Sequence, residues 1–476
     1  MKKYERLARD IEELVDAGTL APGDRLPSVR EAVSRRGVSA STVFEAYYLL
    51  ESRGLIEARP RSGYFVKSPR RRSPEPHAPL PREESTSVAV YDRVQEALGS
   101  IRDRDVVPMG SAFPSPRLFP LHRLARAGAS AMRRLEPDEL LQDISPGNEE
   151  LRRQLALRYA ANGTAVGTDE VIVTNGAMEA LNLCLRVATR PGDVVAIESP
   201  AFYGCLQALE WHQLKAVEIS THPRDGVQLD SLQHALERHP IKACWFMPNF
   251  QNPTGSLMPV DKKQALVELL AQHGVPLIED DAYAELYFGA RRPPPAKAFD
   301  RQGLVMHCSS FSKCLAPGYR IGWAAAGRFA REVERLKLMS TLSVAVPSQV
   351  AVLDYLLHAA YDKHLRGLRA ALAERQAQAL EAIERHFPAG TRVTRPEGGY
   401  LLWVELPDGV DGLQLQRLAL ARRISLTPGH LFSTAPHFHN FVRLNYGHPA
   451  PGQLEGALRT LGRLVHELAA EAGGSG

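Results

Sequence analysis

Apolar residues recur at helical spacing in the first part of the chain, and this pattern predicts three short helices. The apolar positions of the first helix are Tyr4, Leu7, Ile11, Leu14 and Val15. Ser28 and Glu31 have the spacing of a capping box and predict the start of a second helix, which Gly37 ends. Ser39 can cap the third helix, whose apolar stripe consists of Val43, Ala46, Tyr47 and Leu50.

The third predicted helix has a second, mixed face, formed by Ala40, Ser41, Phe44, Glu45 and Tyr48. The segment LIEARPRSGYFV follows Gly54 and predicts two short strands around a turn with Arg59, Arg61 and Gly63 at its tip. Three helices and a basic hairpin are typical of a winged helix-turn-helix, whose third helix enters the major groove of DNA. A small three-helix protein-interaction module is the alternative interpretation of this pattern.

The pattern changes twice further along the chain. Residues 69 to 92, PRRRSPEPHAPLPREESTSVAVYD, lack apolar periodicity and predict a coil linker. From residue 106, helical segments alternate with short apolar runs such as DVVAIES, KACWFMPN and GLVMHCSSFSK, which predicts a mostly parallel α/β sheet. We expect a multi-domain chain with a winged helix-turn-helix at 1–68, a linker at 69–105 and an α/β domain at 106–470.

Charge and composition narrow the range of partners. Residues 1–72 carry a net charge of +5 and the remainder −1, which predicts a polyanion partner for the first domain only. Charged residues interrupt the start of the chain, and no run of 18 apolar residues occurs, so we expect a cytoplasmic protein without a membrane span. The five cysteines are widely spaced and predict neither a disulfide framework nor a metal site.

Candidate chemistry lies where the predicted strands end. Lys313 follows the strand GLVMHC and precedes Arg320, and both burial and a nearby cation favour the neutral amine that Schiff-base formation needs. Residues 175–178 leave a strand and open a helix, where free backbone N–H groups can hold a phosphate. Asp280 and Asp281 end the apolar run VPLI and need a cationic or hydrogen-bonding partner, with a metal site or a helix cap as alternatives.

The segment PGDRLPSVREAVSRRGVSASTVFEAYYLLESRGLIEARPRSGYFV resembles the DNA-binding domain of the GntR family. The resemblance implies contacts to a double-stranded DNA operator from Arg30, Ser39, Ser41, Thr42 and Gly63, to which we add Arg61 at the tip of the hairpin. Related domains that read guanine often have arginine at positions 40 and 44, where this chain has Ala40 and Phe44. Hydroxyl groups, a thymine-methyl contact from Ala40 and phosphate contacts must then carry more of the recognition.

A lysine imine, a phosphate pocket and a carboxylate that faces a pyridinium are what pyridoxal 5′-phosphate (PLP) requires. The segments TNGAMEAL, ESPAFYG, NFQNPTG, EDDAY, SSFSKCLAPGYRIGW and FVRLNYG resemble, in that order, fold type I aminotransferases. The resemblance covers nearly all of residues 106–470 and implies that this domain binds PLP.

Carried over by position, the resemblance implies a role for each site residue. Lys313 would bind PLP as a Schiff base, and Asp280 would pair with the pyridine nitrogen. The remaining contacts to PLP would come from Asn252 and Tyr283 at the phenolic oxygen, Phe202 on the ring, and Gly176, Ala177, Ser310 and Arg320 at the phosphate. Arg443 would bind the α-carboxylate of a substrate or effector, with a structural ion pair as its alternative role.

The fusion of the two domains resembles the MocR family of bacterial transcription regulators. The resemblance implies a homodimer that binds DNA and senses an amino compound or the cofactor itself. A catalytically active aminotransferase with a fused, autoregulatory DNA-binding domain is one alternative, and a dimerisation scaffold without cofactor is another. Many relatives place a tyrosine, donated to the neighbouring subunit's phosphate, where this chain has Gln142.

Overall fold

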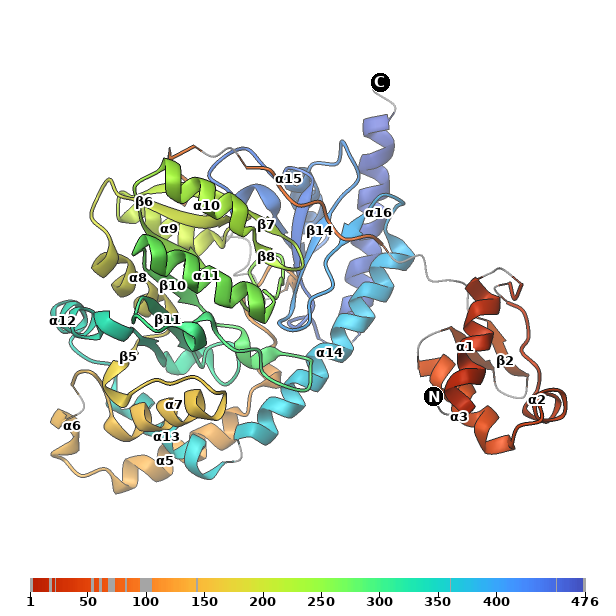
Figure 1. Ribbon diagram of the computed structural model, residues 1–476, viewed down its shortest axis with the longest axis horizontal. Helices are drawn as coiled ribbons and strands as arrows, with labels where there is room; N and C mark the ends of the chain where they lie inside the picture. Colours follow the sequence, from red (N-terminus) through yellow and green to blue (C-terminus); the bar gives the residue numbers. More distant parts are fainter. Residues whose placement is uncertain are drawn as a thin grey trace. The chain divides into compact units, whose positions relative to one another are not determined.

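The computed structural model divides the chain into two compact units, Met1–Arg72 and Ser73–Gly476 (Figure 1). It describes all residues except 1–2, 17–18, 22, 53–54, 60–61, 67–72, 82–83, 95–104, 143, 360, 451 and 474–476. Arg61, a predicted DNA contact, therefore lies outside the described residues. The backbone of Gln142 is described, but its side chain is not. None of the described helices is long and apolar enough to cross a membrane.

The first unit contains the three predicted helices and the hairpin. The helices are α1 (Lys3–Asp16), α2 (Val29–Arg36) and α3 (Ala40–Ser52), and β1 (Ile56–Arg59) pairs antiparallel with β2 (Gly63–Val66). The capping box is confirmed, because the Glu31 N–H donates to Ser28 Oγ and the Ser28 N–H donates to Glu31 Oε2. Gly37 ends α2 with a φ of 63°, a left-handed conformation that glycine adopts at little cost.

The apolar stripe of α3 forms the centre of this unit's core. Val43, Ala46, Tyr47 and Leu50 are all buried, as predicted. The Tyr47 hydroxyl donates to the Pro27 carbonyl at 2.7 Å and joins α3 to the segment before α2, and burial raises the pKa of Tyr47 to about 12. The mixed face of α3 is exposed, so the pattern of the sequence is sufficient to orient this helix.

The second unit is built around a nine-stranded sheet with the strand order β3-β7-β6-β9-β10-β11-β12-β5, with β8 paired to β7. Strands β7, β6, β9, β10 and β11 are parallel, whereas β3, β8 and β12 run antiparallel to their neighbours, and this confirms the mostly parallel sheet. The strands are β3 (Thr86–Ser87), β5 (Val171–Thr174), β6 (Val194–Ser199), β7 (Lys215–His222), β8 (Gly226–Val227), β9 (Ile241–Phe246), β10 (Leu277–Asp280), β11 (Val305–Ser310) and β12 (Gly322–Ala325).

Helices cover both faces of this sheet, because alternate residues of each strand point to opposite sides. On β9, Cys244 and Phe246 pack with α10 (Leu229–Arg238) and α11 (Val260–His273). Ala243 and Trp245 pack with the helices of the other face, which are α8 (Ala177–Ala188), α9 (Tyr203–Trp211) and α12 (Ala330–Ser340). The sheet is thereby buried on both sides, which explains why its strands read as nearly continuous apolar runs.

A smaller sheet with the order β13-β14-β17-β16 completes the second unit. Its strands are β13 (Arg392–Val393), β14 (Leu401–Glu405), β16 (Thr427–Pro428) and β17 (Phe441–Asn445), while β15 (Ile424–Ser425) pairs with β4 (Val107–Pro108). Figure 1 shows the long α14 (Tyr361–His386, cyan) running from α13 (Val346–His358) towards α16 (Gln453–Gly473). The other helices are α5 (Leu121–Arg134), α6 (Glu139–Gln142), α7 (Glu149–Ala161) and α15 (Gly412–Ala421), and short 3₁₀ turns lie at Pro116–Leu118, Thr168–Glu170, Ala284–Leu286, Ala296–Phe299, Pro317–Tyr319, Gly327–Phe329 and Gly429–Phe432.

The described part of residues 69–92, predicted to be a coil linker, is bound to the second unit. Its backbone binds the second unit: Pro74 O accepts from Val393 N at 2.9 Å, and Pro79 O accepts from Ser220 Oγ at 2.7 Å. Further along, Thr86–Ser87 forms strand β3 at the edge of the large sheet. An extended proline-rich backbone has unpaired carbonyl groups that can be bound in this way, so it needs no apolar periodicity. The predicted domain boundaries remain a prediction.

Candidate functional site

A cavity of about 150 Å³ lies beside the carboxyl ends of β10 and β11. Ligands of open α/β sheets bind at this edge. Its lining includes many of the residues predicted to bind a cofactor, namely Ala177, Phe202, Asn252, Asp280, Tyr283, Ser310, Lys313 and Arg320. Gly176 precedes Ala177 in the chain, and Arg443 contacts Asn252 from outside the lining. The fold thus brings together residues that are far apart in the sequence.

Lys313 lies in this cavity just after β11. Its Nζ donates to the Ala112 carbonyl at 2.7 Å and lies 3.6 Å from the centre of the Phe113 ring. Burial and the charges of Arg443 and Arg320 together lower the pKa of Lys313 to about 7, although Asp280 opposes the shift. A substantial fraction of the amine is therefore neutral near pH 7, as a nucleophilic lysine requires.

Asp280 and its neighbour Asp281 have different surroundings although both are buried. The hydrogen bond that Asp280 accepts within the described residues comes from Ala282 N at 3.3 Å, and burial raises the pKa of Asp280 to about 7. Asp281 accepts from Asn249 Nδ2 and His307 Nε2, both at 2.9 Å, and pairs with Arg292 at 3.3 Å. Burial raises the pKa of Asp281, but the hydrogen bond and charge of His307 outweigh that effect, and the pKa lies below its usual value.

The start of α8 provides a candidate phosphate site. Gly176 caps this helix with a φ of 86°, and a Cβ at this position would lie 2.3 Å from Arg320 Nη2. Arg320 donates to Asn175 O at 2.8 Å and to Ser312 Oγ at 3.3 Å. The first N–H groups of a helix have no partner inside the helix, so this corner combines backbone donors with a guanidinium.

Arg443 on β17 is fully buried without a carboxylate partner among the described residues. Its Nη1 donates to Asn252 Oδ1 at 3.1 Å, and its Nη2 donates to Gly110 O at 2.9 Å and Thr427 Oγ1 at 3.0 Å. Its Nε has no hydrogen-bond partner in the described part of the chain. A buried guanidinium that is paired with neutral oxygens alone is costly, and an anionic ligand would compensate that cost.

The sequence reasoning missed the segment 110–113, which faces Lys313 and Arg443. Its carbonyl groups accept hydrogen bonds from side chains of several elements: Gly110 O from Arg443, Ser111 O from Asn445, Ala112 O from Lys313 and Tyr400, and Phe113 O from Asn445. Every residue has a carbonyl group, so no residue type in the sequence marks this role. The availability of these carbonyl groups to the side chains follows from the path of the backbone alone.

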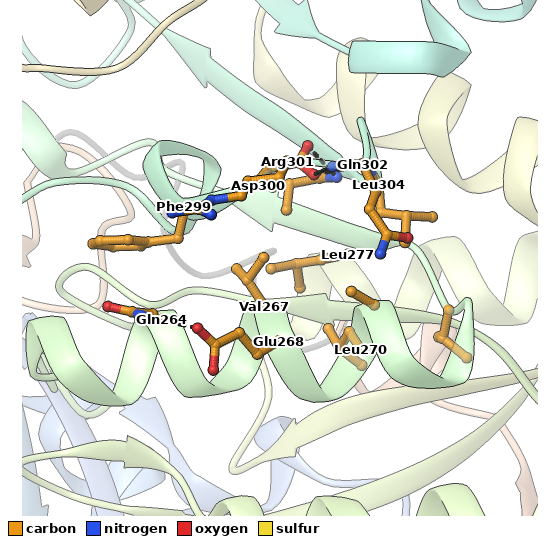
Figure 2. A pocket seen from close by; sticks show the side chains of 13 residues that line it. Gln264, Val267, Glu268, Leu270, Leu277, Phe299, Asp300, Arg301, Gln302 and Leu304 are labelled. Carbon is orange, nitrogen blue, oxygen red and sulfur yellow. Dashed lines mark hydrogen bonds between the residues drawn. The ribbon is translucent and has the colours of Figure 1, made fainter.

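A second cavity, of about 430 Å³, lies between α11 and the loop before β11 (Figure 2). Its floor is apolar, with Val267, Leu270 and Leu277, and Gln264 donates to Glu268 at its edge. Asp300 accepts from the backbone N–H groups of residues 302, 304 and 305 and thereby stabilises the loop. This cavity lacks the cluster of shifted acids and amines that surrounds Lys313.

The predicted DNA contacts lie on the surface of the first unit. Arg30 is exposed on α2, and the hydroxyl group of Ser39 is hydrogen-bonded to those of Ser41 and Thr42 at the start of α3. Gly63 begins β2 with a φ of 98°, and Arg25 lies 3.4 Å from the position that its Cβ would take. These positions are compatible with DNA contact, which remains a prediction for each residue.

Comparisons with known proteins match both units. The family of aminotransferases of class I and II matches residues 118–461, and the gntR family of bacterial regulatory proteins matches residues 3–66. The uncharacterised HTH-type transcriptional regulator YdcR of Escherichia coli is 47% identical over 98% of this chain and 100% of its own length. The 2-aminoadipate transaminase of Thermus thermophilus is 31% identical over 79% of this chain and 94% of its own length.

A solved structure supports the same assignment of the fold. The multiple substrate aminotransferase of Thermococcus profundus has a TM-score of 0.75 and 28% identity, and the similarity covers 79% of this chain and 95% of that one. The mostly parallel α/β fold of the second unit is confirmed by this likeness.

Proposed function

The chain belongs to the aminotransferase class I and II family and carries a gntR-family domain in front of it, as in MocR-type regulators, and from this premise we propose that it is a PLP-binding transcription regulator. The observation that carries the proposal is the cavity around Lys313, where an amine with a lowered pKa lies near a buried arginine that has no carboxylate partner among the described residues. The same chain supplies a helix-turn-helix unit that can bind an operator.

The residues of the cavity fit PLP. The Gly176 corner leaves no room for a side chain beside Arg320, the N-terminus of α8 offers unpaired backbone donors, and Asp280 is a buried acid without a cationic partner at hydrogen-bonding distance among the described residues. We propose the following set of contacts to PLP: Lys313 at the carbonyl carbon, Asp280 at the pyridine nitrogen, Asn252 and Tyr283 at the phenolic oxygen, Phe202 on the ring, and Gly176, Ala177, Ser310 and Arg320 at the phosphate. When bound, PLP supplies an electrophilic carbonyl and an electron-withdrawing ring.

The side chains of this cavity have distinct tasks. Lys313, partly neutral near pH 7, can act as a nucleophile or accept a proton at Nζ. Asp280 becomes ionised when a cationic nitrogen lies beside it, because an opposite charge lowers the pKa that burial has raised. Arg443 binds the carboxylate of an amino acid through a bidentate pair, in which its Nε gains a partner.

We also propose that the protein forms a homodimer. Exposed apolar side chains cluster where α12 ends, namely Leu338, Met339 and Leu342. Thr341 donates to Glu179, which places this end of α12 beside the first turn of α8 and near Met178, a residue of the cavity lining. A patch of this kind is typical of an interaction surface, and a second copy of the chain is the partner that fits the family.

Regulation requires that an amino compound, or the cofactor itself, binds two conformations of the protein with different affinity. Typical coupling free energies are about 1–3 kcal/mol. The test is to titrate a panel of amino acids and amines into the PLP-loaded protein while recording its visible absorption and its affinity for a selected operator. A compound that changes both signals is the effector, whereas constant operator affinity over every titration contradicts the sensor role.

An active aminotransferase with an autoregulatory DNA-binding domain is the second candidate function. It is favoured by the lysine and the buried acid that line the cavity, by Arg443, which contacts the lining residue Asn252, and by the transaminases among the relatives. Full conversion of the cofactor to its pyridoxamine form by one amino acid, with release of the oxo acid, supports this candidate. A spectral change that stays short of this conversion supports the sensor.

DNA binding itself is tested by its dependence on salt. If the first unit contacts about 5 phosphates per half-site, the affinity should fall with a log-log slope of about −4 to −5 for each half-site. A response that is independent of salt supports the alternative of a protein-interaction module.

A further inference from the structure

The helix expected to enter the major groove has an unusual set of side chains. The sequence of α3, ASTVFEAYYLLES, contains no arginine, lysine, asparagine or glutamine. These four residue types supply the common bidentate contacts to guanine and adenine. Purine recognition of that kind therefore cannot come from α3, and another property of the bases must be read by this helix.

The exposed face of α3 carries an apolar stripe. Ala40, Phe44 and Tyr48 are spaced four residues apart and share one side of the helix. Phe44 is 53% exposed and Tyr48 is 74% exposed, whereas Val43, Ala46, Tyr47 and Leu50 fill the core of the unit. The stripe has no packing role within the unit, and a row of exposed apolar side chains indicates a binding surface.

The charged side chains of the segment before α3 are complementary to DNA, whereas the exposed face of α3 itself carries an acid, Glu45, beside the stripe. Arg25, Arg30 and Arg35 are exposed on the segment that precedes α3. The two acids of the same segment are engaged by the backbone, because Asp24 accepts from Ala21 N and Glu31 accepts from Ser28 N. A polyanion is therefore the partner that fits the arginines of this segment.

We propose that Phe44 and Ala40 recognise thymine by contact with its C5-methyl group, so that the operator has thymines at the bases that α3 meets. The methyl group of thymine is the apolar feature of the major groove, and alanine and phenylalanine side chains suit it. Tyr48 lies one helical turn beyond Phe44 on the same face and can reach a phosphate through its hydroxyl. The inference rests on the proposed DNA binding and specifies what that surface reads.

The test uses the full-length protein and a duplex that it selects from a random pool. Each thymine of the selected duplex is replaced in turn by deoxyuridine, which keeps base pairing and removes the methyl group alone. We expect one or two thymines in each half-site at which the replacement weakens binding about fourfold, the effect of burying one methyl group. Phe44→Ala should weaken binding to the thymine duplex and remove the sensitivity to uracil at the thymine that Phe44 contacts, since the contacting ring is lost, whereas a thymine that contacts Ala40 should keep its sensitivity.

A matched control is Leu80→Ala, because Leu80 is 91% exposed and lies outside the first unit. We expect this variant to bind the thymine duplex about fourfold more tightly than the uracil duplex, as the wild type does. A second variant, Phe44→Arg, should select guanine in place of thymine at the contacted base, because arginine binds guanine in a bidentate manner. Phe44 is exposed, so both substitutions leave the core of the unit intact.

The outcomes separate this inference from the proposed function. Selection of a duplex whose thymines tolerate uracil everywhere overturns thymine-methyl recognition and leaves DNA binding established. Unchanged affinity and unchanged uracil sensitivity in Phe44→Ala also overturn it, and would assign the stripe to a protein partner. Failure to select any duplex overturns both DNA binding and the inference that rests on it.

Discussion

Two buried polar regions meet where β10 ends, and they differ in how completely their groups are paired. One is the network around Asp281, which includes Asn249, Lys263, His307 and Tyr159. The other is the cavity around Lys313, with Asp280 and Arg443. Both contain acids and cations that are nearly inaccessible to solvent, so burial alone does not distinguish a functional site from a structural one.

The Asp281 network is connected by good hydrogen bonds from end to end. The Trp323 indole N–H donates to the Tyr159 hydroxyl at 2.8 Å, and that hydroxyl lies 2.6 Å from His307 Nδ1. On its other side, His307 Nε2 lies 2.9 Å from Asp281 Oδ2 and donates to this carboxylate. Among the described residues, only the Nε of Arg292, which also pairs with Asp281, lacks a hydrogen-bond partner in this network. A polar network connected in this way stabilises a unique arrangement of the core.

The two buried lysines show the same contrast. Lys263 donates to Asn249 Oδ1 at 2.6 Å and to Pro294 O at 2.9 Å, and burial lowers its pKa to about 8. Lys313 donates to one carbonyl, its pKa is lowered to about 7 by burial and by Arg443, and it borders an open cavity. Incomplete hydrogen bonding beside a cavity, combined with a shifted pKa, is what makes Lys313 the candidate functional lysine.

Replacing each lysine by alanine should separate the two regions most clearly. We expect Lys313→Ala to abolish the visible absorption band that PLP gives with the wild-type protein, because no other described lysine lines the cavity. Lys263→Ala should keep this band in its folded fraction and lower the free energy of unfolding, since Asn249 loses a buried partner. A normal band in Lys313→Ala would contradict the assignment of the lysine.

Removing each aspartate should affect stability in different ways. Asp281→Ala leaves His307, Arg292 and Asn249 without their shared acceptor, and we expect a loss of about 3–5 kcal/mol in the free energy of unfolding. Asp280→Ala in the PLP-free protein should lose much less, because Asp280 has one weak hydrogen bond. Urea unfolding of both variants near pH 7 measures the difference, and equal losses would contradict the distinction.

In the PLP-free protein, the shifted pKa values of Asp280 and Lys313 should make the free energy of unfolding depend on pH. The pKa of Asp280 rises from 3.8 to about 7 on folding, so its contribution falls as the pH rises from 3.8 to 7. The pKa of Lys313 falls from 10.5 to about 7, so stability recovers between pH 7 and 10.5. Each group contributes on the order of 4 kcal/mol, which predicts a minimum near pH 7.

Urea unfolding at about pH 5, 7 and 9 tests this minimum. Asp280→Asn should reduce the decline on the acid side, and Lys313→Met should reduce the recovery on the alkaline side. A part of each slope remains, because burial also raises the pKa of Glu198 to about 8 and lowers the pKa of Lys263 to about 8. Saturation with PLP should also flatten the profile, because the ligand supplies partners for both groups. A profile that is the same in both variants and in the wild type would assign the pH dependence to other groups.

The smallest predicted effect concerns Arg443. Arg443→Met should weaken binding of amino acids by about 1.5–3 kcal/mol, the contribution of a hydrogen bond to a charged group, and should leave amines without a carboxylate unaffected. Titration of the PLP-loaded protein with an amino acid and its decarboxylated amine measures both effects in one variant. Equal weakening for the two ligands would indicate that Arg443 supports the site through Asn252 alone.

The sequence was sufficient where short-range physics decides the structure. The capping box of Ser28 and Glu31, the buried stripe of α3 and the alternation of strands and helices depend on spacings of two to four residues, and the structure confirms them. The candidate site was also recognisable in part, because residues at strand ends such as Asp280 and Lys313 gather at one edge of a parallel sheet. Their contacts to PLP remain predictions.

The tertiary structure decided what depends on partners that are distant in the sequence. Asp280 and Asp281 are adjacent and chemically identical, yet the pleat of β10 turns them to different surroundings, where His307 and Arg292 pair with only one of them. The carbonyl groups of residues 110–113 and the docking of the proline-rich segment follow from the path of the backbone. Local patterns determined which elements form, whereas the pairing of buried charges depended on which elements the fold places side by side.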